Sequence, residues 1–185
     1  MSKREALLNA AEHKARIGGY SNFSFRELAN EVGIKSASVH YHFPTKEDLG
    51  AELAKRYTEN FLSALGDPDE LVKLSQDPIE HYVGKFRHAL IADQKMCLCG
   101  LFGAESDALP NKVKLHTKAF FLKNIQWLQK AIEKREGANT TPVKARNKAV
   151  FILSLLQGSM MLSKVLDSNE IFSIATTFIE PINNH

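Results

Sequence analysis

Apolar residues recur at helical spacing along most of the 185-residue chain. The stripe that starts at Leu7 and ends at Ala15 precedes two glycines, so we expect a first helix over about 3–16. Similar stripes and breaks predict later helices over about 46–65, from 78, near 98–106, and over 110–135, 142–166 and 169–179. No stretch alternates long enough to indicate a strand, and the pattern predicts an all-α fold.

Helix start and stop signals are densest between residues 24 and 49. Ser24 stands three positions before Glu27, which is the spacing of a capping box, and Gly33 is the residue best suited to end that helix in a sharp turn. A short second helix is expected next, with Ile34 and Val39 pointing into the same small core as the first. Thr45 and Asp48 then predict the cap of a third.

The outward face of the short helix carries small and polar side chains. Such a face allows the backbone to approach DNA bases and offers donors to base edges and phosphates, whereas a helix start favours an anion. The structural alternative is a three-helix piece of an all-α core. We expect DNA contacts from Ser24, Arg26, Lys35, Ser36, Ala37, Ser38, His40, Tyr41, His42 and Lys46.

The order Gly33-Ile34, Val39, an aromatic and histidine cluster ending in Phe43, then Pro44-Thr45-Lys46-Glu47 and Leu49 resembles the DNA-binding domain of the TetR family of bacterial regulators. Lys35 and His40 depart from the commoner Ser or Thr and Tyr of that pattern. The resemblance implies a helix-turn-helix domain over 1–46 and a helical ligand-binding and dimerisation domain over 47–185. It implies a regulator, commonly a repressor, that a small molecule releases from operator DNA.

The net charge is only +3, from 24 Lys and Arg against 21 Asp and Glu. Residues 1–65 hold nine basic and eight acidic side chains, which is little charge for a DNA binder. Two copies related by a two-fold axis would double the phosphate contacts and read a pseudo-palindromic operator. The small net charge of a single copy therefore favours a dimer as the DNA-binding form.

Two C-terminal segments, 149–166 and 171–179, are apolar around most of the helix circumference. The simplest cover for the second face is the same pair from another copy, in a four-helix bundle; burial inside a monomer is the alternative. The predicted dimer residues are Phe151, Leu155, Gly158, Ser159, Leu162, Ile171, Phe172, Ala175, Phe178 and Ile179.

The middle of the chain combines apolar side chains with a few polar ones, as ligand pockets do and as protein cores also do. Core packing is the alternative for each residue taken singly. The pocket implied by the resemblance would be lined by Phe86, Leu90, Cys99, Phe102, Phe120, Asn124, Trp127, Gln157 and Met160.

Cys97 and Cys99 are the only cysteines, and one intervening residue does not suit a disulfide or a zinc clip. They are expected to be small buried hydrophobes; the alternative is a thiol sensor of electrophiles or oxidants with a lowered Cys99 pKa. No phosphate-binding glycine loop or hydrolase motif occurs, so we expect no enzyme, cofactor or metal. A less favoured reading is an all-α small-molecule binding protein without DNA binding.

We expect no segment to be long and apolar enough to cross a bilayer, and the N-terminus lacks the apolar stretch of a signal peptide. The sequence therefore predicts a soluble cytoplasmic protein.

Overall fold

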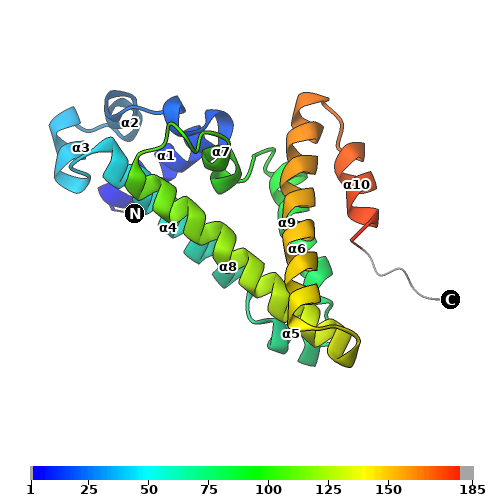
Figure 1. Ribbon diagram of the computed structural model, residues 1–185. Coiled ribbons are helices and arrows are strands. Elements are labelled where there is room, and N and C mark those ends of the chain that lie inside the picture. Colours follow the sequence, from blue (N-terminus) through cyan, green and yellow to red (C-terminus); the bar gives the residue numbers. More distant parts are fainter. Residues whose placement is uncertain (1, 180–185) are drawn as a thin grey trace. The chain divides into compact units, whose positions relative to one another are not determined.

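The computed structural model describes residues 2–179, which fold into helices and turns without a strand (Figure 1). Their contacts group into two compact units. Unit 1 comprises residues up to 61 together with 97–121, and unit 2 comprises 62–96 together with 122 onward. The predicted all-α fold is confirmed for the described residues. The predicted boundary at residue 46 concerns functional domains and stays a prediction.

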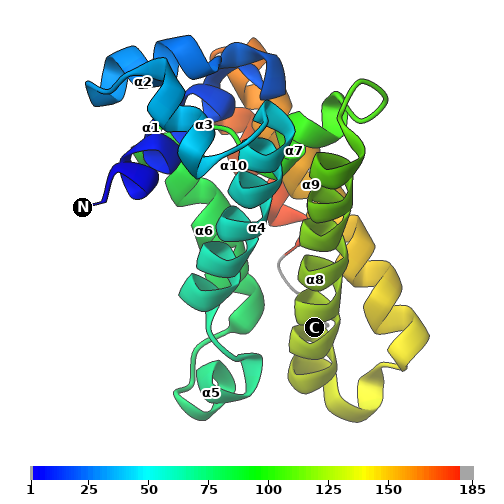
Figure 2. The ribbon, with the colours of Figure 1, turned by 90° about the vertical axis from the view of Figure 1, so that its left-hand side faces the viewer.

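Unit 1 contains the helices α1 (Lys3–Gly18), α2 (Phe25–Val32), α3 (Ser36–His42) and α7 (Leu98–Ala104). It also contains most of α4 (Lys46–Leu65) and the first part of α8 (Asn111–Glu136), and a 3₁₀ turn at Tyr20–Asn22 joins α1 to α2. Its interior is apolar, with Leu7, Phe23 and Leu49 fully buried. Figure 2 shows α2 and α3 together at one end of this unit.

Unit 2 contains α5 (Pro68–Lys73), α6 (Pro78–Arg87), α9 (Pro142–Val165) and α10 (Glu170–Thr177), with the remainder of α8. A π-helical turn follows α6 at His88–Ala92, and a 3₁₀ turn at Gly137–Asn139 precedes α9. The sequence analysis missed α5, which begins at a proline capped by Asp67. Since α5 has only six residues, its helical periodicity is too short to detect.

Most predicted boundaries agree with the structure within two residues. One expectation was wrong: α9 is long and apolar enough, by length and composition, to cross a bilayer, with an 18-residue window of mean hydropathy 1.2. Of that window, 39% is buried within the structure. A core helix of a soluble protein passes the same test, so this property is weak evidence for a membrane span.

Candidate nucleic-acid interface

The turn between α2 and α3 is fixed by hydrogen bonds at both ends of α2. The Glu27 amide donates to Ser24 Oγ at 3.3 Å, and the Ser24 amide donates to Glu27 Oε2 at 2.9 Å, which completes the predicted capping box. The Ser24 hydroxyl also donates to this carboxylate and lowers the pKa of Glu27. Gly33 ends α2 with φ 69°, and the Ile34 amide donates to Ala29 O at 3.0 Å. These contacts set the direction in which α3 leaves the turn.

Helix α3 buries Val39, half-buries His42 and exposes its other side chains. Val39 is fully buried, as predicted, whereas Tyr41 is 86% exposed. Both the ring and the hydroxyl of Tyr41 are therefore accessible to a partner. The exposed side chains on and beside α3 are those of Lys35, Ser36, Ala37, Ser38, His40 and Tyr41. This α3 face contains six of the ten predicted DNA-contact residues.

His40 is held in one orientation by two neighbours. Its ring meets the Phe25 ring edge to face at 4.9 Å between centroids, and its Nδ1 lies 3.2 Å from Pro44 O. Because a proline carbonyl can only accept, Nδ1 carries the proton in this hydrogen bond. The other ring nitrogen, Nε2, is then the atom of neutral His40 that accepts a hydrogen bond.

The Lys46 side chain packs against two aromatic rings and does not extend freely into solvent. Its Nζ lies 4.7 Å from the ring centroids of both Tyr20 and Phe23, a cation–π arrangement. Partial burial lowers the pKa of Lys46, while Glu105 and Glu27 oppose this shift. The sequence analysis missed this contact because Tyr20 lies in a 3₁₀ turn without a periodic pattern. A phosphate contact by Lys46 stays a prediction.

Three other predicted contacts lie around α3. The Ser24 hydroxyl is engaged in the capping box, and Arg26 is exposed on the first turn of α2. His42 is half-buried, and its ring lies 5.3 Å from that of Tyr41. Of these three side chains, Arg26 is therefore the most accessible to a phosphate.

Residues far along the chain support this helix-turn-helix. Glu105 Oε1 accepts from the Tyr20 amide at 3.0 Å, between the end of α7 and the turn before α2. At the start of α4, Glu47 Oε1 accepts from the Lys112 amide at 3.0 Å. Asp48 Oδ1 lies 2.7 Å from Lys112 Nζ. The sequence analysis missed these contacts, since the partners are more than sixty positions apart.

The charges at this contact change the pKa values of the groups that form it. Hydrogen bonds from Lys112 and then Thr45 lower the pKa of Asp48. The hydrogen bond to Asp48, together with the negative charge of that carboxylate, raises the pKa of Lys112. Both side chains are therefore held in their charged forms around neutral pH.

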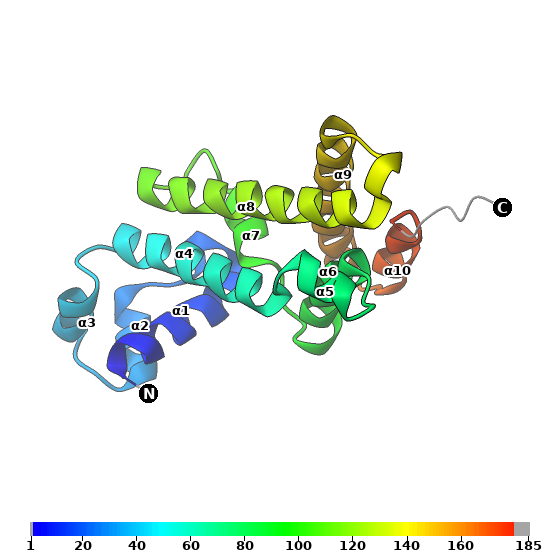
Figure 3. The same cartoon turned by 90° about the horizontal axis from the view of Figure 1, so that it is seen from below.

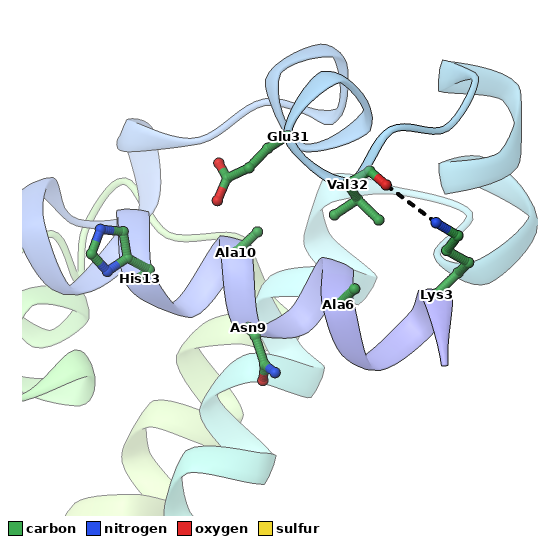
Figure 4. Close-up of a pocket in the computed structure, with 7 residues that line it drawn as sticks. All are labelled: Lys3, Ala6, Asn9, Ala10, His13, Glu31 and Val32. Carbon is green, nitrogen blue, oxygen red and sulfur yellow. Dashed lines mark hydrogen bonds between the residues drawn. The ribbon is translucent and has the colours of Figure 1, made fainter. Parts of the chain in front are cut away.

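A groove of about 540 Å³ lies between α1 and the end of α2 (Figure 4). Lys3 Nζ donates to Val32 O at 3.3 Å across it, which satisfies a carbonyl at the end of α2. Its lining residues are Lys3, Ala6, Asn9, Ala10, His13, Glu31 and Val32. None of them belongs to α3, so this groove is distinct from the exposed α3 face.

The residues predicted to line a ligand pocket divide between the two units. Cys99, Phe102 and Phe120 are fully buried in unit 1, where the Phe120 ring lies 5.6 Å from that of Tyr57. In unit 2, buried Asn124 accepts from the Tyr82 hydroxyl at 2.7 Å. The other unit 2 members of the predicted set are Phe86, Leu90, Trp127, Gln157 and Met160.

The Trp127 indole of unit 2 also has a fixed place. It donates from Nε1 to Gly66 O at 2.8 Å, and its ring centroid lies 5.4 Å from that of Tyr82. The Tyr82 hydroxyl is in turn bonded to Asn124. Asn124, Tyr82 and Trp127 therefore form one polar and aromatic cluster inside unit 2.

The two cysteines are buried side chains of unit 1. Cys97 stands at the N-cap position of α7 without a side-chain hydrogen bond to the helix, and Cys99 lies in the first turn. Burial, followed by the nearby Cys97 and Glu12, raises the pKa of the Cys99 thiol well above its usual value. This is opposite to the lowered pKa on which the sensor alternative depended, and the thiol-sensing hypothesis is not favoured.

The residues predicted for dimerisation form a mixed set in unit 2. Phe151 and Leu162 are each 53% exposed on α9, and Phe178 after α10 is 71% exposed. Ser159 and Phe172 instead belong to the interior, and Ser159 Oγ donates to Leu156 O at 3.1 Å. The remaining members, with part or much of their surface accessible, are Leu155, Gly158, Ile171, Ala175 and Ile179.

Comparisons with known proteins agree with this geometry. The family described as bacterial regulatory proteins, tetR family, matches residues 7–53, which cover α2 and α3. The HTH-type transcriptional regulator LmrA of Bacillus subtilis is 22% identical over 163 residues, covering 86% of this chain and 85% of LmrA.

Two solved structures are similar over nearly the whole chain. A TetR-family regulator from Agrobacterium tumefaciens is 28% identical with a TM-score of 0.85, covering 96% of this chain and 95% of its own. A TetR regulator from Legionella pneumophila is 29% identical with a TM-score of 0.84, covering 97% and 96%. The helix-turn-helix match and the likeness along the chain agree, and this chain belongs to the TetR family of bacterial transcriptional regulators.

Proposed function

We propose that the chain acts as a homodimer that binds a pseudo-palindromic operator and is released from it by a small molecule, so that it represses its target genes. The observation that carries the proposal is the exposed face of α3, with Tyr41 86% exposed beside small side chains. In this arrangement the protein works in the cytoplasm, where its operator DNA lies.

The small side chains of α3 suit close approach to the major groove. Ser36, Ala37 and Ser38 present little bulk, so the helix backbone can come near base edges, and the two hydroxyls can donate or accept. His40 Nε2 accepts from a base amino group when the ring is neutral, because Pro44 holds the proton on Nδ1. Arg26 and Lys35 are exposed cations for phosphates.

The exposed apolar side chains of α9 and α10 support the homodimer. Phe151, Leu162 and Phe178 would lose their water-exposed surface against the same side chains of a second copy. Gly158 is exposed on α9, and a Cβ placed there would meet nothing within 4 Å inside the chain. It therefore leaves room for close approach by a partner helix. Ser159 and Phe172 are not part of this proposed face.

The interior of unit 2 supports the binding of a small, mostly apolar effector. The Tyr82–Asn124 hydrogen bond supplies a polar pair among buried apolar side chains, which is the usual composition of a ligand site. Helices α4 and α8 each contribute residues to both units, so a change in unit 2 can bias unit 1 through them. An effector must bind the operator-free state more tightly to cause release.

The DNA-binding proposal is tested with an operator selected from a random-sequence duplex library. We expect the full-length protein to enrich one pseudo-palindrome, and Ala37→Glu to lose that binding because the new carboxylate would face DNA. Asn60→Glu adds the same charge at an exposed position of α4 and should retain binding. Equal affinity of the wild type and Ala37→Glu would exclude α3 as the reading helix.

Release is tested separately with small molecules that raise the melting temperature of the protein. A molecule that stabilises the protein should also weaken its affinity for the selected duplex in fluorescence anisotropy. If stabilising molecules leave operator affinity unchanged, the coupling is absent even though DNA binding persists.

A further inference from the structure

The inner part of the polar and aromatic cluster of unit 2 is closed to solvent. Tyr82 and Asn124 are fully buried, and the Tyr82 hydroxyl donates to Asn124 at 2.7 Å. Trp127 is half-buried, and its ring lies 5.4 Å from that of Tyr82. A molecule that binds this cluster must therefore displace an element that covers it.

One covering element is the segment 66–76, which contains α5 and which we call the α5 strap. The Trp127 indole donates from Nε1 to Gly66 O at 2.8 Å, at the point where the strap begins. Figure 3 shows α5 beside the last part of α8. The strap, Trp127 and Tyr82 all belong to unit 2. Opening of the strap would therefore free the Trp127 ring that packs against Tyr82.

The α5 strap has little apolar anchorage. Pro68 and Leu71 are its buried side chains, and the others lie partly or largely in solvent. Helices α6 and α9 instead bury rows of apolar side chains in the interior of unit 2, so displacing either of them would cost more. A segment with few buried apolar contacts opens locally at a small fraction of the free energy of global unfolding.

Exposed ion pairs attach the strap to α8. Lys130 Nζ lies 2.9 Å from Asp67 Oδ1 and 3.2 Å from Asp69 Oδ2. Lys134 Nζ lies 3.1 Å from Asp69 Oδ1. Hydrogen bonds from these lysines lower the pKa of Asp67 and of Asp69, so both carboxylates are charged at neutral pH. Since the pairs are exposed, their attraction is modest and is screened by salt.

Both ends of the strap have a residue in the left-handed region of backbone conformation. Gly66 has φ 71°, which glycine adopts readily, and Ser75 has φ 58°, which a side chain disfavours. Just beyond Ser75, Asp77 caps α6 and lies 3.1 Å from Arg135 of α8. This contact fixes the start of α6, so the strap has a hinge at Ser75 and another at Gly66. Opening relieves the unfavourable conformation of Ser75.

We propose that the α5 strap is a lid, held closed by its ion pairs to α8, that opens about Gly66 and Ser75 to admit a small, mostly apolar molecule to the Tyr82–Asn124–Trp127 cluster. The inference rests on the proposed effector site in unit 2 and adds how that site is reached. Entry would then be faster at high ionic strength, because salt weakens the pairs that keep the lid closed.

The experiment combines hydrogen exchange of the full-length protein, followed by mass spectrometry, with acrylamide quenching of Trp127, the only tryptophan of the chain. In Lys130→Glu/Lys134→Glu, the side chains that hold the strap repel it. Exchange of the strap amides should rise by about tenfold or more, and acrylamide should quench Trp127 more strongly than in the wild type. In the wild type, raising KCl from about 0.1 to about 1 M shortens the Debye length from about 10 to about 3 Å and should increase both quantities.

Two further variants separate lid opening from general charge and from misfolding. Lys144→Glu/Lys148→Glu makes the same change of charge on α9 and breaks the exposed Lys148–Glu136 pair, so strap exchange and Trp127 quenching should stay those of the wild type. Adding Asp69→Lys to Lys130→Glu/Lys134→Glu re-forms pairs of opposite sign and should restore much of the protection. Amides of α9 should exchange at the wild-type rate in the strap variants, since the opening is local.

Unchanged strap exchange in Lys130→Glu/Lys134→Glu would overturn the lid. So would faster strap exchange with unchanged Trp127 quenching, because the strap would then move without uncovering the cluster, and so would equal changes in Lys144→Glu/Lys148→Glu. If the strap variant unfolds, the wild type decides: strap exchange that does not rise with KCl overturns the inference. These measurements use neither DNA nor effector. A strap that opens as expected, while no stabilising molecule weakens operator binding, would refute the proposed release and leave the lid in place.

Discussion

Helices α3 and α9 both leave one face uncovered, but the two faces have opposite chemistry. The α3 face carries serine, alanine, lysine and imidazole side chains with Tyr41 as its one large apolar group. The face of α9 carries Phe151 and Leu162, each 53% exposed. An uncovered polar helix face can be solvated at little cost, whereas an uncovered apolar one favours association.

The two helices are also fixed in different ways. Helix α3 has seven residues and depends on its neighbours: the Gly33 turn before it and the Pro44 carbonyl that holds His40. Helix α9 has 24 residues and is capped by Thr141, whose Oγ1 accepts from the Lys144 amide at 3.3 Å. A short helix held by its surroundings can be displaced as a unit. A long apolar helix instead provides area for a stable interface.

The largest effect is expected from breaking the proposed apolar face. Leu162→Glu should convert the dimer to a monomer, because a carboxylate cannot be buried against a second copy without a partner. Operator affinity should then fall by about 100-fold or more, since the two reading helices no longer bind as one unit. Analytical ultracentrifugation and fluorescence anisotropy measure the two quantities.

Leu74→Glu is the matched control for this change. Leu74 is 68% exposed, lies after α5 and is outside both α9 and α10. It should leave both mass and affinity unchanged. A Leu162→Glu protein that remains a dimer with full DNA affinity would remove the α9 face from the interface.

The second effect separates the α3 face from the α9 face. Tyr41→Ala should weaken operator binding by about tenfold or more, as expected for loss of a hydrogen bond to a charged phosphate in each copy. Its melting temperature and dimer mass should remain those of the wild type, because Tyr41 is 86% exposed.

Tyr41→Phe distinguishes the hydroxyl from the ring. If the hydroxyl contacts phosphate, Phe should resemble Ala in affinity; if the ring packs on the sugar–phosphate backbone, Phe should resemble the wild type. Unchanged binding by Tyr41→Ala would show that this exposed aromatic has no role in the DNA contact.

The contrast also explains how much the sequence could predict. Helix α2 was located to the residue because the contacts of Ser24, Glu27 and Gly33 that begin and end it lie within the segment itself. The sequence could not show which face of α9 is buried, because apolar residues occupy most of the circumference of this helix. Ser159 therefore had no sequence signal that it would be buried.

The long-range contacts of the interface were beyond the sequence pattern for a related reason. Lys46 was expected at a phosphate site, but its ammonium lies over Tyr20 and Phe23. Glu105 and Lys112, which support the helix-turn-helix, are ordinary surface residues by sequence. Such pairings depend on which helices become neighbours, and periodicity within one helix does not specify that.

A smaller effect tests the turn that directs α3. Gly33→Ala should destabilise the protein by about 1 kcal/mol, because φ 69° is a left-handed conformation that a side chain disfavours. A Cβ there would meet nothing within 4 Å, so steric overlap with neighbours does not contribute. The expected fall in melting temperature is about 2–4 °C.

Gly84→Ala is the control for Gly33→Ala. A Cβ at Gly84 also meets nothing within 4 Å, but Gly84 lies inside α6, where alanine is favoured over glycine by about 1 kcal/mol. It should raise the melting temperature. Opposite signs for the two changes would confirm that backbone conformation, and not lost space, makes Gly33 necessary.

The smallest effect concerns pH and compares the caps of α2 and α9. The Ser24 hydroxyl lowers the pKa of Glu27 below its ordinary value of 4.5, so the stability given by this carboxylate is present above that pH. This contribution is lost as the pH falls through the lowered pKa of Glu27 in the folded protein.

The melting temperature difference between wild type and Ser24→Ala should therefore shrink as the pH falls from 6 to about 3. Thr141→Ala removes a cap from α9, whose first turn has no acid, and its difference should stay constant over the same range. Parallel pH profiles for the two variants would show that Glu27 contributes nothing beyond the serine cap itself.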